Sequence, residues 1–296
     1  MKNFVLRLAA GAIGLLIASQ ASAQGSRTPD QLIDQLASID CHGPGLYPYF
    51  PFPDFWAVEP DPNQNMHRAG PTPDCVPDAM RSLVRLGPRA LPALVRHITD
   101  TRPTGLGIGV KLDPHKVFLG GQVFGEEYDS RAHVYDERGW PSVFLDCVNA
   151  CFGNREFLDP YTIRVGDVCF TLIGQIVNRY MVAARYQMTG WVVVNSPIET
   201  PLLARKVRSD WMGLDAEGLR DSLLADLRTP LRKPPPGYAS PFNGGTYAQR
   251  ESSSLSRLYA GALRRLRFYY PKTYASLSGR DLVKRKAFER GEGDNL

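Results

Sequence analysis

A stretch near the middle of the sequence combines carboxylates with histidine. It contains the residues Glu126, Glu127, Asp129 and His133, and Asp113 and His115 occur shortly before them. Two carboxyl groups a few ångströms apart can serve as acid and base in the hydrolysis of a glycosidic bond. Acidic residues between strands are also common in solvated turns. The pattern therefore predicts either a hydrolase of envelope polymers, with catalytic groups in residues 113–137, or an exposed turn.

Three polar residues, Gln175, Asn178 and Arg179, interrupt an apolar helical pattern over residues 168–180. Because buried polar groups need hydrogen-bond partners, two interpretations are open. In the first, the three side chains bond to the loop around Asn195 and connect the helix to a strand. In the second, they line a pocket in which the arginine binds a carboxylate or a phosphate. The second interpretation predicts a module that binds a small anionic ligand.

The first 23 residues have the pattern of a secretory signal peptide. Lys2 and Arg7 precede an apolar run, and the small residues Ala21 and Ala23 fit a cleavage site. The apolar run is shorter than the roughly 20 residues that a membrane-spanning helix needs. We therefore expect these residues to be removed during export. The remaining chain is then periplasmic or secreted, with no stable membrane insertion.

Five cysteines occur in the sequence, namely Cys41, Cys75, Cys147, Cys151 and Cys169. An oxidising compartment favours disulfides. Cys41 and Cys75 bracket an irregular segment, where a cross-link restricts the unfolded chain most, so we predict that they pair. Cys147 and Cys151 either form disulfides or stay buried as small apolar residues. No further ligand type lies nearby at metal-binding spacing, so we predict neither a metal site nor a cofactor.

The clearest helical pattern lies in residues 74–100. A first apolar stripe consists of Met80, Leu83 and Val84, and a second consists of Leu91, Leu94, Val95 and Ile98. Gly87 and Pro88 separate the stripes, which predicts two short antiparallel helices. Another helix is predicted over residues 28–39, where Thr28 and Pro29 form a starting signal. Two further helices are predicted to begin after Asp167 and Asp215, each at a cap position before an apolar helical pattern.

Residues 83–95, with the sequence LVRLGPRALPALV, resemble a HEAT repeat. The likeness includes the Leu-Gly turn, the alanine and proline of the inner helix and the leucine pair that follows, with Asp100 at the closing aspartate position. It covers residues 74–100. The resemblance implies a helical array that presents a surface to another protein. Residues 166–197 also resemble segments of exported bacterial proteins, a likeness that implies no activity.

The whole pattern predicts a mainly α fold, an irregular HEAT-like helical array with a small β insertion and long proline-rich loops. The helical domain is expected over residues 24–228, with glycine-spaced strands near residues 101–145. Residues 229–246 form a proline- and glycine-rich linker. Residues 247–296 form a final helix and a basic tail, which we expect to pack on the main domain.

The net charge of +5, of which Lys2 and Arg7 contribute two, is too small to predict a nucleic-acid partner. A non-enzymatic protein-interaction or scaffold module is the favoured function, and its partner is expected to be a protein. The proline- and aromatic-rich arm over residues 47–53 is a candidate contact. The hydrolase and the anionic-ligand module remain the alternatives.

Overall fold

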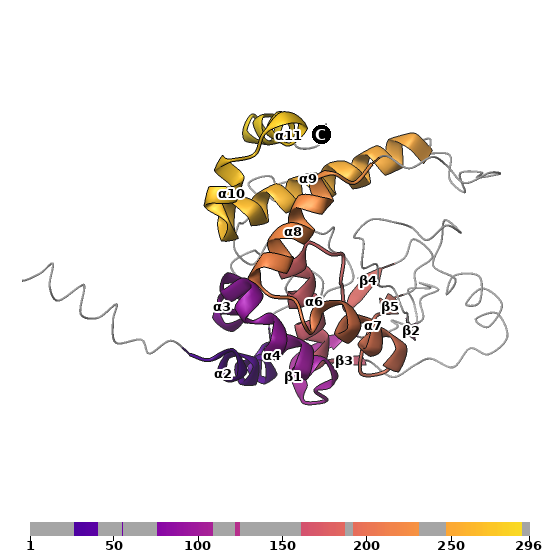
Figure 1. Ribbon diagram of the computed structural model, residues 1–296. Coiled ribbons are helices and arrows are strands. Elements are labelled where there is room, and N and C mark those ends of the chain that lie inside the picture. Colours follow the sequence, from indigo (N-terminus) through magenta and orange to yellow (C-terminus); the bar gives the residue numbers. More distant parts are fainter. Residues whose placement is uncertain are drawn as a thin grey trace, which may run out of the picture.

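The computed structural model describes residues 27–40, 55, 76–108, 122–124, 161–186, 192–230 and 247–291. Most of these residues are helical, which confirms the predicted mainly α fold with a small β part (Figure 1). The α-helices are α2 (Pro29–Asp34), α3 (Asp78–Leu86), α4 (Leu91–Arg96), α6 (Val165–Val177), α7 (Pro201–Trp211), α8 (Ala216–Leu227), α9 (Tyr247–Tyr269), α10 (Pro271–Ala275) and α11 (Gly279–Glu289). Short 3-10 helices are η1 (Gln35–Ser38), η4 (Gly87–Arg89) and η5 (His97–Thr99).

Helix α6 is the centre of the core. Every residue of this helix except Gln175 is buried, so the helix is covered on all sides. Helices α3 and α4 and the 3-10 helix η5 pack against it, and α8 contacts it as well. The sequence places Asp167 at the cap of this helix, but Asp167 stands inside the first turn, where its carboxylate accepts a hydrogen bond from the backbone N–H of Arg164.

The two predicted apolar stripes of residues 74–100 face the core. Met80 of α3 and Leu91 of α4 are fully buried. Between the helices, Gly87 adopts a φ of +58°, a left-handed conformation that favours glycine. A Cβ atom at Gly87 would lie 2.7 Å from the ring of Tyr269, at the end of α9. The turn thus requires glycine both for its backbone and for the close approach of the tyrosine.

The strands form two small sheets. Strand β1 (Pro103–Ile108) pairs antiparallel with β3 (Tyr161–Arg164). In the second sheet, β5 (Val192–Val194) lies between β2 (Gln122–Phe124) and β4 (Ala184–Tyr186), parallel to β2 and antiparallel to β4. Strand β1 therefore pairs with a strand that precedes α6 in the sequence, and β2 pairs with a strand that follows α6. Strands β1 and β2 do not form a hairpin with each other.

The last three helices form a layer over α8, with α9 the longest of them (Figure 1). Helix α11 is attached mainly by polar contacts. The ammonium of Lys284 donates to the backbone carbonyl of Leu227 at the end of α8, and Arg285 donates to the carbonyls of Tyr274 and Ala275 at 3.0 and 2.9 Å. Basic side chains thus satisfy carbonyls at the C-termini of α8 and α10.

Several predictions fall on residues outside the described ranges. These are the signal peptide, the proline- and aromatic-rich arm at residues 47–53, the linker beyond residue 230 and the cysteines Cys41, Cys75, Cys147 and Cys151. Cys169, on α6, is described and is a buried free thiol, and burial raises its pKa. Among the described helices, none combines the length and apolarity that a membrane span requires.

Candidate functional site

Asn178 and Arg179, which directly follow α6, lie in a buried cluster that joins this helix to α8 and α9. We name Asn178, Arg179, Asp226 and Arg265 the Asp226 cluster. The guanidinium of Arg179 donates to Oδ2 of Asp226 at 2.7 Å, and the side-chain amide of Asn178 donates to the same oxygen at 2.8 Å. Both side chains of the ion pair are only 6% exposed. Arg179 is therefore neutralised within the protein.

Arg265 completes the cluster from α9. It donates to the side-chain oxygen of Asn178 at 2.9 Å and to the backbone carbonyl of Gln175 at 2.8 Å. Its guanidinium also lies 4.9 Å from the centre of the Phe55 ring, a cation–π contact. Burial raises the pKa of Asp226, and the arginine and amide contacts oppose this effect. The cluster joins three helices through one carboxylate and two guanidinium groups.

Asn178 and Arg179 bind α8 and α9, whereas the first interpretation placed their partners in the loop around Asn195. Both side chains donate to Asp226 of α8, and Asn178 also donates to the backbone carbonyl of Leu258 on α9, while the amide of Asn195 donates to the carbonyl of Val182. The buried Oε1 atom of Gln175 has no hydrogen-bond partner among the described residues. The ligand interpretation of the three residues stays a prediction.

A second buried group surrounds Asp167 at the start of α6. The hydroxyl of Ser196 donates to one carboxylate oxygen at 2.6 Å, and the hydroxyl of Tyr161 donates to the other at 2.8 Å. Burial raises the pKa of Asp167, and the hydrogen bonds oppose this effect. Tyr161 and Ser196 carry no sequence signal, because their roles depend on strands brought together only by the fold. The group connects β3, α6 and the segment after β5.

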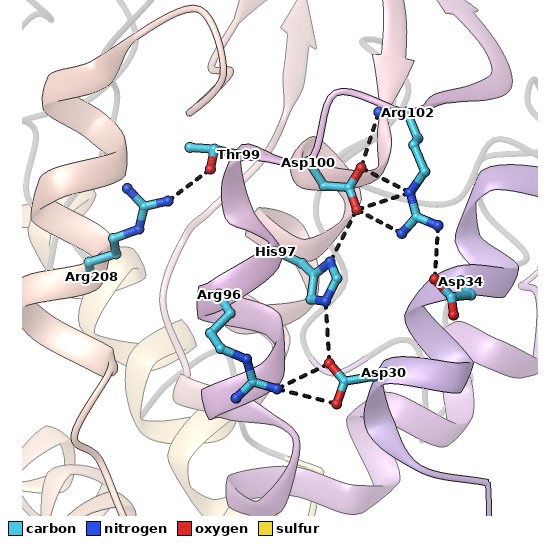
Figure 2. A network of polar contacts seen from close by, with 8 residues as sticks. All are labelled: Asp30, Asp34, Arg96, His97, Thr99, Asp100, Arg102 and Arg208. Atoms are coloured by element: carbon cyan, nitrogen blue, oxygen red, sulfur yellow. Dashed lines mark hydrogen bonds and ion pairs between the residues drawn. The ribbon is translucent and has the colours of Figure 1, made fainter.

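A third polar network lies nearer the surface and holds the first helix in place (Figure 2). We name Asp30, Asp34, His97, Asp100 and Arg102 the α2 clamp. The two ring nitrogens of His97 lie 3.2 Å from Asp30 and 3.1 Å from Asp100. Arg102 donates to Asp100 at 2.7 Å and to Asp34 at 2.8 Å. Two carboxylates of α2 are thus bound by His97, the first residue of η5, and by Arg102, which directly precedes β1.

The α2 clamp does not have the geometry of a general base. Each ring nitrogen of His97 already faces a carboxylate oxygen, which leaves no nitrogen free for a substrate proton. Burial alone would raise the pKa of Asp100, but hydrogen bonds from Arg102 and His97 outweigh it and lower the pKa to about 2. The network is therefore a cross-link between elements, in which Arg102 forms ion pairs with both Asp34 and Asp100.

The acidic candidates of the sequence, Glu126, Glu127, Asp129 and His133, lie outside the described residues, as do Asp113 and His115. The structure therefore leaves the hydrolase prediction untested. Within the described ranges, no group of three or more histidine, cysteine, aspartate or glutamate residues could hold a metal ion.

An exposed surface on α11 contrasts with the buried clusters. At about 100° per residue, Arg280 and Lys286 flank Val283 at about 60° on either side of the helix. We name Arg280, Val283 and Lys286 the α11 outer face. Val283 is 68% exposed, more than any other exposed large apolar residue among those described. The described part of the chain gives Arg280 and Lys286 no hydrogen bond or ion pair.

The acidic residues of α11 are paired within the protein. Asp281 pairs with Arg228 of the loop after α8 at 3.3 Å, and Glu289 lies 3.5 Å from Arg285. The α11 outer face therefore presents two cations around one apolar side chain. The sequence alone does not indicate this face, because the pattern of basic residues does not distinguish the anchored side of the helix from its exposed side.

Comparisons with family models, with curated proteins and with solved structures find no match to this chain. The fold and the contacts described above are therefore the basis for inferring a function. The buried clusters use their charged groups to connect elements, whereas the α11 outer face leaves its charged groups exposed.

Proposed function

We propose that this chain is an exported helical protein-interaction module that binds a protein partner through the α11 outer face. The observation that carries the proposal is the exposed Val283 between two cations that form no hydrogen bond or ion pair with the described residues. Interface centres combine an apolar anchor with a charged rim, which is the arrangement of these three side chains. The Asp226 cluster and the α2 clamp, by contrast, have their charges paired within the fold.

Two features of the sequence support the proposal. The resemblance of residues 83–95 to a HEAT repeat fits a HEAT-like scaffold, and the stripes that carry this resemblance are buried against α6. The signal-peptide pattern fits an exported protein that is periplasmic or secreted. A scaffold of this kind presents a surface and needs no reactive group.

The proposal is tested by affinity capture in the compartment where the protein is expected. The full chain, with an affinity tag after the cleavage site, is expressed with its own leader, and proteins bound to it are identified by mass spectrometry. We expect one protein to be enriched reproducibly over an unrelated exported bait. That protein, purified, should form a binary complex with the chain in calorimetry. Absence of any binary complex would contradict the proposed function.

A further inference from the structure

We infer that the α11 outer face takes an acidic amphipathic helix of a protein partner, an inference that rests on the proposed function. The described segment 247–291 contains eleven basic and three acidic residues. The segment with α9, α10 and α11 therefore attracts negatively charged partners. Such electrostatic attraction speeds the encounter of complementary surfaces. The partner must also offer an apolar side chain, because Val283 lies between the cations.

The distance between the two cations of α11 defines the distance between the carboxylates that the partner must offer. Arg280 and Lys286 are separated by about 9 Å along the helix axis, since each residue rises about 1.5 Å. A partner helix places two carboxylates at a similar separation when glutamates stand six or seven residues apart. An apolar residue three positions after the first glutamate then faces Val283. The matching pattern is Glu-x-x-Leu-x-x-Glu, read along one face of a helix.

The inner side of α11 keeps this face oriented outward. Lys284 binds the end of α8, Arg285 binds the end of α10, and Asp281 pairs with Arg228. Around the helix, Asp281 and Arg285 lie about 160° from Val283 and Lys284 lies about 100° from it, so rotation of the helix would break these contacts. The two cations are thus presented in a fixed register, which reduces the entropy lost on binding.

The test uses a synthetic helical peptide with repeated Glu-x-x-Leu-x-x-Glu units as the probe. Binding to the isotope-labelled full mature chain is followed by the chemical shifts of α11 backbone amides at low salt. Two control peptides carry glutamine in place of glutamate, or the same residues in scrambled order. We expect the probe to bind at least 10-fold more tightly than either control. Equal binding of the scrambled peptide would overturn the inferred helical spacing.

Variants locate the probe on the chain. R280E/K286E should weaken binding at least 10-fold, and Val283→Ser should weaken it about 5-fold, because a buried apolar contact is lost. The matched control R205E/K206E makes the same charge change on α7, where both residues are exposed and have no recorded partner. It should bind within 2-fold of the original chain. Equal losses in both double variants would show attraction by net charge alone and overturn the inference. Thermal unfolding of each variant confirms that the fold is kept.

Two further binding measurements, one with lipid vesicles and one with the captured partner, distinguish the remaining explanations. Binding to vesicles of phosphatidylglycerol and phosphatidylcholine, without binding to the peptide, would overturn the inference in favour of an anionic membrane surface. If the purified partner binds R280E/K286E as well as the original chain, the α11 outer face is not the binding surface, and both the proposed function and this inference fail. If that variant loses the partner but the original chain does not bind the peptide, the proposed function stands and this inference alone fails. If no partner exists, the proposed function fails. Loss of the partner only in the α11 variant, together with binding of the peptide, supports both.

Discussion

At the scale of single residues, most of the side chains that could do chemistry are used to hold the described core together. Asp226 receives hydrogen bonds from both Arg179 and Asn178, and Arg265, only 2% exposed, binds the same asparagine. Asn178 has a φ of +60°, which asparagine tolerates better than most residues at the end of a helix. One residue thus ends α6 and also organises its polar contacts.

The first prediction concerns the Asp226 cluster. Asp226→Ala removes the carboxylate and leaves the buried guanidinium of Arg179 without its ion pair. Breaking a buried pair in this way costs about 3–5 kcal/mol, so the free energy of unfolding should fall by that amount in chemical denaturation. The control Asp221→Ala removes an exposed carboxylate of the same helix, paired with Arg220, and should cost less than about 1 kcal/mol. Similar losses for both variants would contradict the role assigned to Asp226.

At the scale of elements, two sets of contacts connect the N-terminal helices to the rest of the described fold. The α2 clamp binds the first helix through its acidic residues, as Figure 2 shows. The turn at Gly87 receives Tyr269, whose hydroxyl donates to the backbone carbonyl of Val84. The α2 clamp depends on charge, and the contact of Tyr269 with the turn at Gly87 depends on shape. We therefore expect pH to affect the first and a change of side-chain volume to affect the second.

The α2 clamp predicts a specific loss of stability in acid. The pKa of Asp100 is about 2 in the folded protein, below its usual value of about 3.9. A lowered pKa contributes stability above pH 4, and this contribution is lost as the pH falls from about 4 to about 2. The size is about 1 kcal/mol, given solvent screening. In chemical denaturation, the stability difference between the original chain and Asp100→Asn should shrink over this range; a difference that stays constant would refute the assignment.

The turn at Gly87 predicts a difference between two glycines. Gly87 and Gly279 have nearly equal φ values of +58° and +56°, but only Gly87 has a neighbour that a Cβ atom would meet. Gly279→Ala should cost about 1–2 kcal/mol from backbone strain. Gly87→Ala should cost at least about 1 kcal/mol more, because the ring of Tyr269 must also move and because the ψ of −129° takes Gly87 outside the αL region that alanine can enter. Thermal unfolding of both variants measures this difference, and equal losses would show that the tyrosine contact adds nothing.

At the scale of the whole molecule, the sequence predicts the helices well where apolar periodicity and starting signals coincide. Thr28 caps α2 and Asp215 caps α8 through side-chain hydrogen bonds, as their positions before helical patterns indicate. The Asp167 group and the α2 clamp could not be predicted, because their members lie far apart in sequence. His97, for example, meets Asp30 across 67 residues. Local patterns define helices, but only packing decides which polar groups meet.

The contact between Tyr269 and the turn of residues 84–87 has a consequence for biogenesis. Val84 and Tyr269 are separated by 185 residues, so the turn between α3 and α4 stays incomplete until α9 has been synthesised. Such distant pairings slow folding, because a long loop must close first. Until α9 is made, the helices α3 and α4 would lack this contact and be less stable.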